Sequence, residues 1–288
     1  MGPNCVSLST LRILPKTIRN AYVVADSLNT ATGDRITTVI LPRFPKVLLQ
    51  ELNTHRVFSR NAASSRAIPV EKMIQKTLND PYIPKFTKAQ KGMSGIEDED
   101  VDFQGKCEDE WGFAMTDAIA GVRKLLELGC HKQNANRLLE PFVRVPVIIT
   151  STKWENFFNL RCHPEAHPDF REVAIAIRQA REESEPATLG VGQWHIPMFT
   201  DEMEDFRLSE RKVIAIARCA RVSYNNHDGT SFDYEKDLTL YKRLESSGHL
   251  SPFEHCALAV ESSSDVDCRN FSGFYSHRAL LEDIKKKS

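Results

Sequence analysis

Cationic, hydroxyl and amide side chains crowd into residues 55–66, which read His-Arg-Val-Phe-Ser-Arg-Asn-Ala-Ala-Ser-Ser-Arg. An Arg guanidinium binds phosphate through a planar fork of donors, and Ser hydroxyls add further donors. Each residue alone is typical of an exposed helix end, but their density favours a site for an anion or a nucleotide. The apolar residues of 47–52 share one face, so we predict a helix that starts there and presents these donors.

The same stretch resembles the signature of the flavin-dependent thymidylate synthases, Arg-His-Arg-x-x-Ser-x-Asn-Glu-x-Ser-x-Arg-Tyr. The departures are Thr54 for the first Arg, Ala62 for the Glu and Ala67 for the Tyr. The positions that match at the family's spacing are His55, Arg56, Ser59, Asn61, Ser64 and Arg66.

A second block resembles the family segment Asn-Phe-Leu-x-Leu-Arg, followed after four residues by Ala-Gln-x-Glu-Ile-Arg. Here the chain reads Asn-Phe-Phe-Asn-Leu-Arg over 156–161 and Ala-His-Pro-Asp-Phe-Arg over 166–171. His167 replaces the Gln and Asp169 replaces the Glu. Arg137 is similar to a further family Arg that helps to hold the nucleotide.

A third block is similar to the family pattern Ala-Arg-x-Ser-Tyr, followed after a helix by Gly-His-x-Ser-Pro-Phe-Glu-His. It reads Ala-Arg-Val-Ser-Tyr over 220–224 and Gly-His-Leu-Ser-Pro-Phe-Glu-His over 248–255. In the family this block lies near the N-terminus, before the Arg-rich signature. The chain therefore resembles a circularly permuted member, a rearrangement that proteins tolerate when their original ends lie close together at the surface.

The resemblance implies an enzyme that makes dTMP from dUMP. Methylenetetrahydrofolate would supply the carbon, reduced FAD would supply the hydride, and NADPH would reduce the flavin. The family forms homotetramers with active sites between subunits, so a homo-oligomer is implied as well.

The resemblance also implies residue roles. Arg161 would lie against the pyrimidine and stabilise the negative charge that develops on the ring, as a fixed cation does in electrostatic catalysis. The residues expected to bind substrate are Glu51, Ser64, Ser65, Arg66, Arg137 and Arg161. The residues expected to bind FAD are His55, Arg56, Ser59, Asn156, Leu160, His249, Ser251 and Glu254.

Two alternatives stay open at this point. The family places Gln where this chain has Glu51, and a carboxylate only accepts hydrogen bonds. Glu51 would favour dCMP, whose exocyclic amine donates, or a hydroxymethylated product. Ala62 and Thr54 replace signature residues. The second alternative, from another functional class, is therefore a catalytically inactive protein that binds nucleotides or nucleic acid.

Composition bounds the partners and the compartment. The net charge of −1 gives no overall field for nucleic acid or anionic membrane, and we expect neither as a partner. Seven Cys without a C-x-x-C pair favour reduced thiols and a cytoplasmic location. We expect no metal, because the Cys and His residues of 162–167 fit no zinc spacing and the acidic run 97–102 lacks the glycine of a calcium loop.

The strands and helices that must position these residues can be predicted from the sequence pattern. They indicate an α/β fold, a twisted β-sheet flanked by helices, in a single domain over 1–288. Apolar and β-branched runs predict strands at 21–26, 36–41 and 143–150. Helical spacing predicts helices at 72–78, 108–128, 132–140, 154–161, 169–183 and 234–245. We expect a loop at 85–107, an irregular stretch and possible linker at 184–207, and a terminal helix that begins within 270–278. Tyr275, His277 and Arg278 are either site residues or part of its surface.

Overall fold

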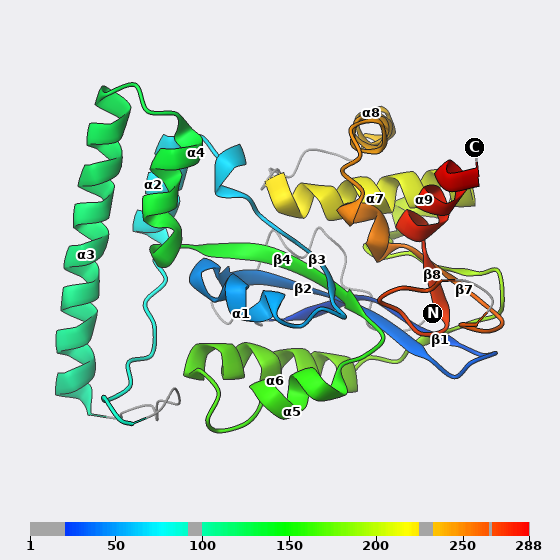
Figure 1. Cartoon of the computed structure of the whole chain (residues 1–288), viewed down its shortest axis with the longest axis horizontal. Coiled ribbons are helices and arrows are strands. Elements are labelled where there is room, and N and C mark those ends of the chain that lie inside the picture. Colours follow the sequence, from blue (N-terminus) through cyan, green and yellow to red (C-terminus); the bar gives the residue numbers. More distant parts are fainter. Residues whose placement is uncertain (1–20, 92–99, 225–232, 265–266, 288) are drawn as a thin grey trace.

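A five-stranded mixed sheet forms the centre of the chain in a computed structural model, which describes residues 21–91, 100–224, 233–264 and 267–287 (Figure 1). The strands lie in the order β3-β4-β2-β1-β5, and only β1 and β5 pair in parallel. Their bounds are Tyr22–Asn29 (β1), Arg35–Pro45 (β2), Ser59–Ala62 (β3), Arg144–Ser151 (β4) and Ala187–Leu189 (β5). The three predicted strands are confirmed as β1, β2 and β4.

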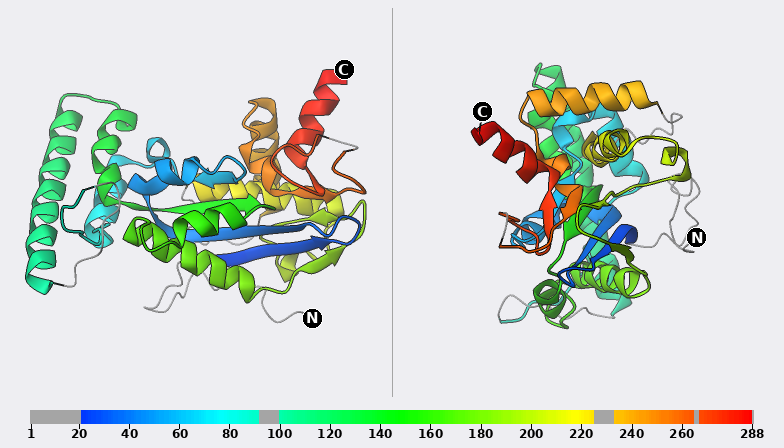
Figure 2. Two further views of the ribbon diagram at one scale, coloured as in Figure 1. Left: turned by 60° about the horizontal axis from the view of Figure 1, so that its bottom comes forward. Right: turned by 90° about the vertical axis from the view of Figure 1, so that its right-hand side faces the viewer.

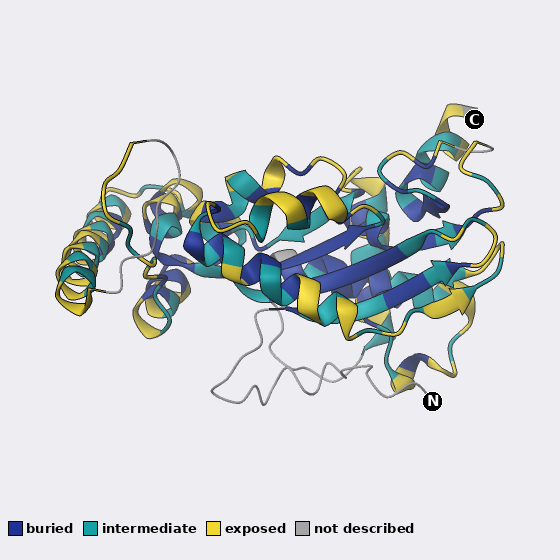
Figure 3. Ribbon diagram, turned by 90° about the horizontal axis from the view of Figure 1, so that it is seen from below, coloured by how far each residue is buried: buried dark blue, intermediate teal, exposed yellow. Residues whose placement is uncertain are grey.

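Helices cover both faces of this sheet, which confirms the predicted α/β fold. The helices α5 (Glu155–Arg161) and α6 (Pro168–Glu182) lie on one face, and α7 (Leu208–Tyr224) lies on the other (Figure 1). Figure 3 shows that the strands between them are largely buried. The buried side of α6 repeats at helical spacing and consists of Phe170, Val173, Ala174 and Ile177, which join the main core under the sheet.

A second sheet, in the order β6-β7-β8, brings the C-terminal part of the chain to one end of the first. Its strands are Trp194–His195 (β6), Ala257–Ala259 (β7) and Phe274–Ser276 (β8). The short helix η6 (Ser251–His255) leads into β7, and α9 (His277–Lys287) follows β8 directly and packs on η6. The helix α8 (Tyr234–Ser246) packs on α7.

The other end of the molecule is helical (Figure 2). It consists of α2 (Val70–Asn79), α3 (Val101–Glu127), α4 (Lys132–Ala135) and the 3-10 helix η4 (Asn136–Phe142). The Asp100 side chain accepts hydrogen bonds from the backbone N–H groups of Asp102 and Phe103, which caps α3. Trp111 packs the inner side of α3 against Tyr82 and Phe142.

The helix predicted to run from 47 through the donor-rich stretch is wrong beyond residue 53. The structure has η2 (Lys46–Leu48) and α1 (Leu49–Asn53), and then the strand β3. The Thr54 hydroxyl donates to the carbonyl oxygen of Glu51 at 2.7 Å, which competes with helix continuation. Pairing of β3 with β4 then fixes the extended backbone. The turn η3 (Ser65–Ala67) follows.

Three further expectations are corrected. The loop predicted at 85–107 ends where α3 begins, seven residues before the helix predicted from 108. The irregular stretch 184–207 contains β5, β6 and η5 (Asp201–Met203), because each of its strands pairs with a distant part of the chain. Residues 274–276 form β8 before the terminal helix starts at His277. The single-domain organisation stays a prediction.

The described residues include no helix that is long and apolar enough to cross a membrane. Among the same residues, no group of three or more His, Cys, Asp or Glu side chains is placed to hold a metal ion.

Candidate functional site

An open pocket of about 420 Å³ joins the first sequence block to the third. The segment from α1 to β3 supplies most of the lining residues, and η6 supplies Ser251 and Glu254. The lining residues are Leu49, Asn53, Arg56, Phe58, Arg60, Ala62, Val147, Ser251, Glu254 and Asn270. The lining therefore mixes apolar and polar side chains, as in many pockets that bind small molecules.

The two arginines of this pocket differ in availability. The Arg60 guanidinium donates to the Asn53 side chain at 2.5 Å and to the carbonyl oxygen of Phe58 at 2.8 Å. Arg56 is exposed and has no hydrogen-bond or ion-pair partner among the residues that the structure describes. Arg56 is therefore the cation that is free to bind an anionic ligand here.

Hydrogen bonds hold the first and third blocks together beside the pocket. The Asn61 side-chain amide donates to the Ser251 hydroxyl oxygen at 2.9 Å, and its oxygen lies 2.9 Å from His255 Nε2. These contacts join residues more than 180 positions apart in the sequence. The two blocks share one site although most of the chain separates them.

The second block meets the first through Arg161. Its Nη1 lies 2.9 Å from the Glu51 carboxylate, and its Nε donates to His55 Nε2 at 3.0 Å. The guanidinium also lies over the Phe170 ring, 4.7 Å from the ring centre. Burial, the nearby Arg161 and then Arg60 lower the pKa of His55 to about 4, so the imidazole is neutral and can accept this hydrogen bond.

The segment 49–62 is thus shared by both halves of the site. Glu51 and His55 contact Arg161, whereas their neighbours Asn53 and Arg56 line the pocket. His55 and Arg56 are consecutive, so a single peptide bond joins a residue that contacts Arg161 to a residue that lines the pocket.

The expected phosphate ligands form a separate group around η3 and η4. The Ser65 hydroxyl donates to Glu140 at 2.5 Å, and Glu140 also pairs with Lys46 at 3.7 Å and Arg137 at 3.9 Å. Burial lowers the pKa of Lys46. Ser64 and Arg66 flank Ser65. Among the described residues, no hydrogen bond or ion pair joins this group to Arg161.

The other predicted cofactor ligands occupy different surroundings. Asn156 and Leu160 are exposed one turn apart on α5, with 54% of Leu160 accessible. Ser59 is buried at the start of β3. His249 is exposed, and its Nδ1 lies 3.1 Å from the Ser247 hydroxyl. Their roles in FAD binding stay predictions.

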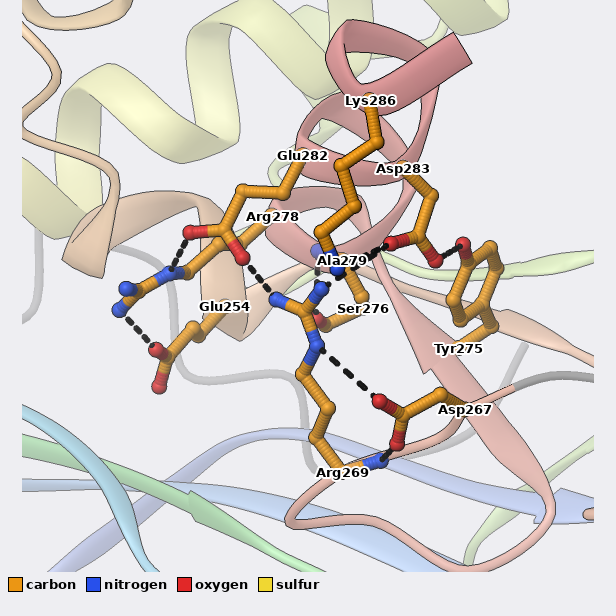
Figure 4. A network of polar contacts seen from close by, with 10 residues as sticks. All are labelled: Glu254, Asp267, Arg269, Tyr275, Ser276, Arg278, Ala279, Glu282, Asp283 and Lys286. Atoms are coloured by element: carbon orange, nitrogen blue, oxygen red, sulfur yellow. Dashed lines mark hydrogen bonds and ion pairs between the residues drawn. The ribbon is translucent and has the colours of Figure 1, made fainter.

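An ion-pair network holds Glu254, which lines the pocket (Figure 4). Arg278 Nη1 donates to Glu254 at 2.6 Å, and Arg278 Nε donates to Glu282 at 2.8 Å. Arg269 pairs with Glu282 and with Asp283, and Tyr275 donates to Asp283 at 2.5 Å. Burial would raise the pKa of Glu282, but the hydrogen bonds from Arg278 and Arg269 outweigh it and lower this pKa.

Sequence reasoning left Arg278 open between site and surface, and it missed Arg269. The four-residue spacing of Arg278 and Glu282 on a helix is the one signal that pointed to their pairing. Arg269 comes from the loop before β8, and nothing in its local sequence predicts its pairing with Glu282 and Asp283.

Comparison with known proteins gives the family. The sequence profile of the thymidylate synthase complementing proteins (Thy1) matches residues 36–187, just over half of the chain. This chain belongs to that family, the flavin-dependent thymidylate synthases. The general chemistry that membership supports is methylation at C5 of a pyrimidine nucleotide by a methyltransferase.

One solved structure that resembles the Thy1 chain is the UMP/dUMP methylase PolB from Streptomyces cacaoi, bound with 5-Br UMP. The two share 15% sequence identity with a TM-score of 0.42, over 56% of this chain and 91% of that one. No curated protein sequence matches the chain.

Proposed function

We propose that this Thy1 protein transfers a one-carbon unit from methylenetetrahydrofolate to C5 of a deoxypyrimidine monophosphate, converting dUMP to dTMP with FAD as cofactor and NADPH as reductant. The observation that carries the proposal is the convergence of three distant sequence blocks on one site. Arg161 of the second block contacts His55 of the first, and Ser251 of the third contacts Asn61 of the first.

The pocket residues fit FAD in their chemistry. Leu49 and Ala62, which are half-buried, offer apolar surface to a planar ring, and Arg56 offers an unpaired guanidinium to a phosphate. Ser251 adds a polar group at the edge. When bound and reduced, FAD supplies the hydride, and the protein positions it.

Arg161 supports the proposed chemistry at the pyrimidine. Negative charge develops on the ring carbonyl oxygens when C5 becomes nucleophilic, and a fixed cation lowers the energy of that state. The neutral His55 ring, whose centre lies 5.0 Å from the centre of the Phe157 ring, holds the guanidinium in place by accepting its hydrogen bond. The Glu51 carboxylate offsets part of the Arg161 charge until substrate binds.

The nucleotide phosphate is assigned to Ser64, Ser65, Arg66 and Arg137. Arg66 and Arg137 are exposed cations, Lys46 is half-buried, and Glu140 pairs with Lys46 and Arg137. A dianion would compete with Glu140 for these donors, since charge-assisted hydrogen bonds to phosphate are strong.

Two features support a homo-oligomer and a permuted segment order. The expected FAD ligands Asn156 and Leu160 lie exposed on one chain, as they would if a second copy completed the site. The block at 248–255 comes last in the sequence and still lines the same pocket as the block at 55–66. A homotetramer with sites between subunits is the assembly that the family suggests.

The test is a reaction of the purified protein with FAD, NADPH, methylenetetrahydrofolate and dUMP, followed by mass spectrometry of the nucleotide. Formation of dTMP that requires all four components supports the proposal. A colourless protein that takes up no added FAD and makes no product would favour a binding protein without catalysis.

The Glu51–Arg161 pair favours a second candidate, a dCMP methylase or a hydroxymethylase. The carboxylate lies 2.9 Å from the guanidinium that the family uses on the base, and it can accept a hydrogen bond from the cytosine amine. Offering dUMP and dCMP together and weighing the products separates the two. Methylated dUMP as the sole product would exclude the cytosine reading.

A further inference from the structure

A continuous row of hydrogen-bonded side chains crosses the five-stranded sheet and ends at the pocket. Its outer half joins Ser27 to His195 Nδ1 at 2.9 Å and His195 Nε2 to Thr38 at 2.8 Å. Its inner half runs from Thr38 to Thr150 (2.7 Å), to His255 Nδ1 (2.8 Å), from His255 Nε2 to Asn61 (2.9 Å) and on to Ser251 (2.9 Å). Ser251 lines the pocket.

Most of this row is buried, and an apolar cluster lies beside it. Thr38, Thr150 and His255 are 0% exposed, and His195 is 1% exposed. The neighbours Ile40 and Ile148 on the same strands pack against α7 in an apolar cluster. A buried polar network is costly unless its members are hydrogen-bonded, and here every buried member has a partner within the row. Apolar residues would fill this space at lower cost, which points to a role beyond packing.

The direction of every hydrogen bond in the row follows from one group. The Asn61 amide nitrogen donates to Ser251, so its oxygen accepts from His255 Nε2–H. A neutral imidazole has one donor and one acceptor, so His255 Nδ1 accepts from the Thr150 hydroxyl. Burial lowers the pKa of His255 to about 3, which keeps this imidazole neutral.

The same logic continues to the far end. The Thr150 hydroxyl donates to His255 and therefore accepts from Thr38. The Thr38 hydroxyl in turn accepts from His195 Nε2–H. His195 Nδ1 then accepts from Ser27. Burial also lowers the pKa of His195 to about 3, so both imidazoles are neutral and carry their proton on Nε2. All six hydrogen bonds point toward the pocket.

The end of the row determines what Ser251 can do. Its oxygen accepts from Asn61, so its own hydroxyl proton is left to donate, and the part of the chain that the structure describes offers it no acceptor. An amide does not pass a proton on as an imidazole does, so Asn61 prevents the row from acting as a proton wire. The row orients a donor instead.

We propose that the Ser27–His195–Thr38–Thr150–His255–Asn61 row fixes the Ser251 hydroxyl as a hydrogen-bond donor to an acceptor atom of the ligand in the pocket. His195 and His255 are thus positioning residues of the site. The assignment of that ligand as FAD rests on the proposed function, and a flavin carbonyl oxygen or ring nitrogen is an acceptor of the required kind.

The first test needs no ligand. Nitrogen-15 NMR of the full-length protein labelled at histidine distinguishes protonated from unprotonated ring nitrogens. We expect both His195 and His255 as the Nε2–H tautomer from pH 7 down to about 5. The Nδ1–H tautomer at either residue would mean that the row points away from Ser251, and would overturn the proposal.

The second test measures FAD affinity by fluorescence titration. Loss of one neutral hydrogen bond weakens binding roughly three- to tenfold, and we expect this for Ser251→Ala and for Thr150→Val, which cuts the row. Thr150→Ser keeps the hydroxyl and should restore the wild-type affinity. Thr37→Val is the matched control, a buried strand threonine whose hydroxyl bonds Asp26 outside the row.

The outcomes separate the two hypotheses. Unchanged FAD affinity in both Ser251→Ala and Thr150→Val would overturn the role of the row. Equal losses in Thr150→Val and Thr37→Val would do so as well, since they would reflect general destabilisation. Wild-type protein that binds no FAD would refute the proposed function, while the tautomer measurement would still decide the direction of the row.

Discussion

Replacing Glu51 by Gln removes the negative charge beside Arg161 and keeps the side-chain size. The two groups lie 2.9 Å apart, with side chains 38% and 19% exposed. Exposed ion pairs contribute roughly 0.2–1 kcal/mol, whereas breaking a buried pair costs roughly 3–5 kcal/mol. The new amide oxygen can still accept from the guanidinium, so we expect Glu51→Gln to lower the free energy of unfolding by only about 1 kcal/mol.

Substrate choice should change much more than stability. Under the proposed function, an amide at this position would leave Arg161 to act on the pyrimidine with its full charge, and the amide could donate to the uracil O4. The cytosine amine would lose a carboxylate acceptor. A hydrogen bond to a charged group contributes roughly 1.5–3 kcal/mol, so the ratio of kcat/KM for dUMP over dCMP should rise roughly tenfold to a hundredfold.

The assay measures kcat/KM for each nucleotide by mass spectrometry of the product. Glu172→Gln is the matched control, because Glu172 is an exposed glutamate on α6 that pairs with Lys85 at 3.5 Å. If Glu51→Gln lowers stability as expected but leaves the dUMP/dCMP ratio at its wild-type value, Glu51 does not face the base and the reasoning is refuted.

Three further predictions follow from the same geometry. The free energy of unfolding should fall as pH drops from about 6.5 towards 4, by roughly 1–3 kcal/mol for each histidine that is neutral when folded, because the unfolded chain then binds protons that the folded chain does not. Urea unfolding at pH 7 and pH 4.5 checks this, and equal free energies of unfolding at the two pH values would contradict it. The histidines concerned are His55, His195, His255 and His277. Phe157→Ala should cost roughly 3–5 kcal/mol of unfolding free energy, since this 2% exposed ring packs on Phe58, Trp154 and His55; a loss under about 1 kcal/mol in denaturant titration would argue against this core. Arg278→Met should weaken FAD binding roughly threefold or more by releasing Glu254, whereas Lys286→Met, at the exposed end of the same network, should leave it unchanged; equal effects would show that the network does not act through Glu254.

The sequence predicted those elements whose cause is local. The strands at 22–29 and 35–45 are rich in β-branched residues, and the helices α5 and α6 follow their apolar spacing. The strand β3 was missed because its extended backbone depends on pairing with β4, more than eighty residues away. Propensity over 59–62 alone gives no sign of that partner.

The residues of the candidate site also fall into a group that the sequence predicted and a group that it missed. The family resemblance predicted Arg161, Arg56 and Ser251 as site residues, a prediction that stays open, and the structure brings Arg161 to His55 and lines one pocket with Arg56 and Ser251. The row through His195 and the pairing of Arg269 with Glu282 were not predicted, because each link joins a different strand or loop. No spacing rule connects residues whose only relation is tertiary.

The most direct test of the central claim is a titration of dUMP into the FAD-loaded protein, followed by the flavin absorption spectrum. If Arg56, Arg161 and Ser251 belong to one site that holds a flavin beside a nucleotide, dUMP should shift the flavin bands of the wild type, and Arg161→Met should need a concentration at least tenfold higher for the same shift. A flavin spectrum that does not respond to dUMP or to dCMP, or a protein that retains no FAD, would contradict the account.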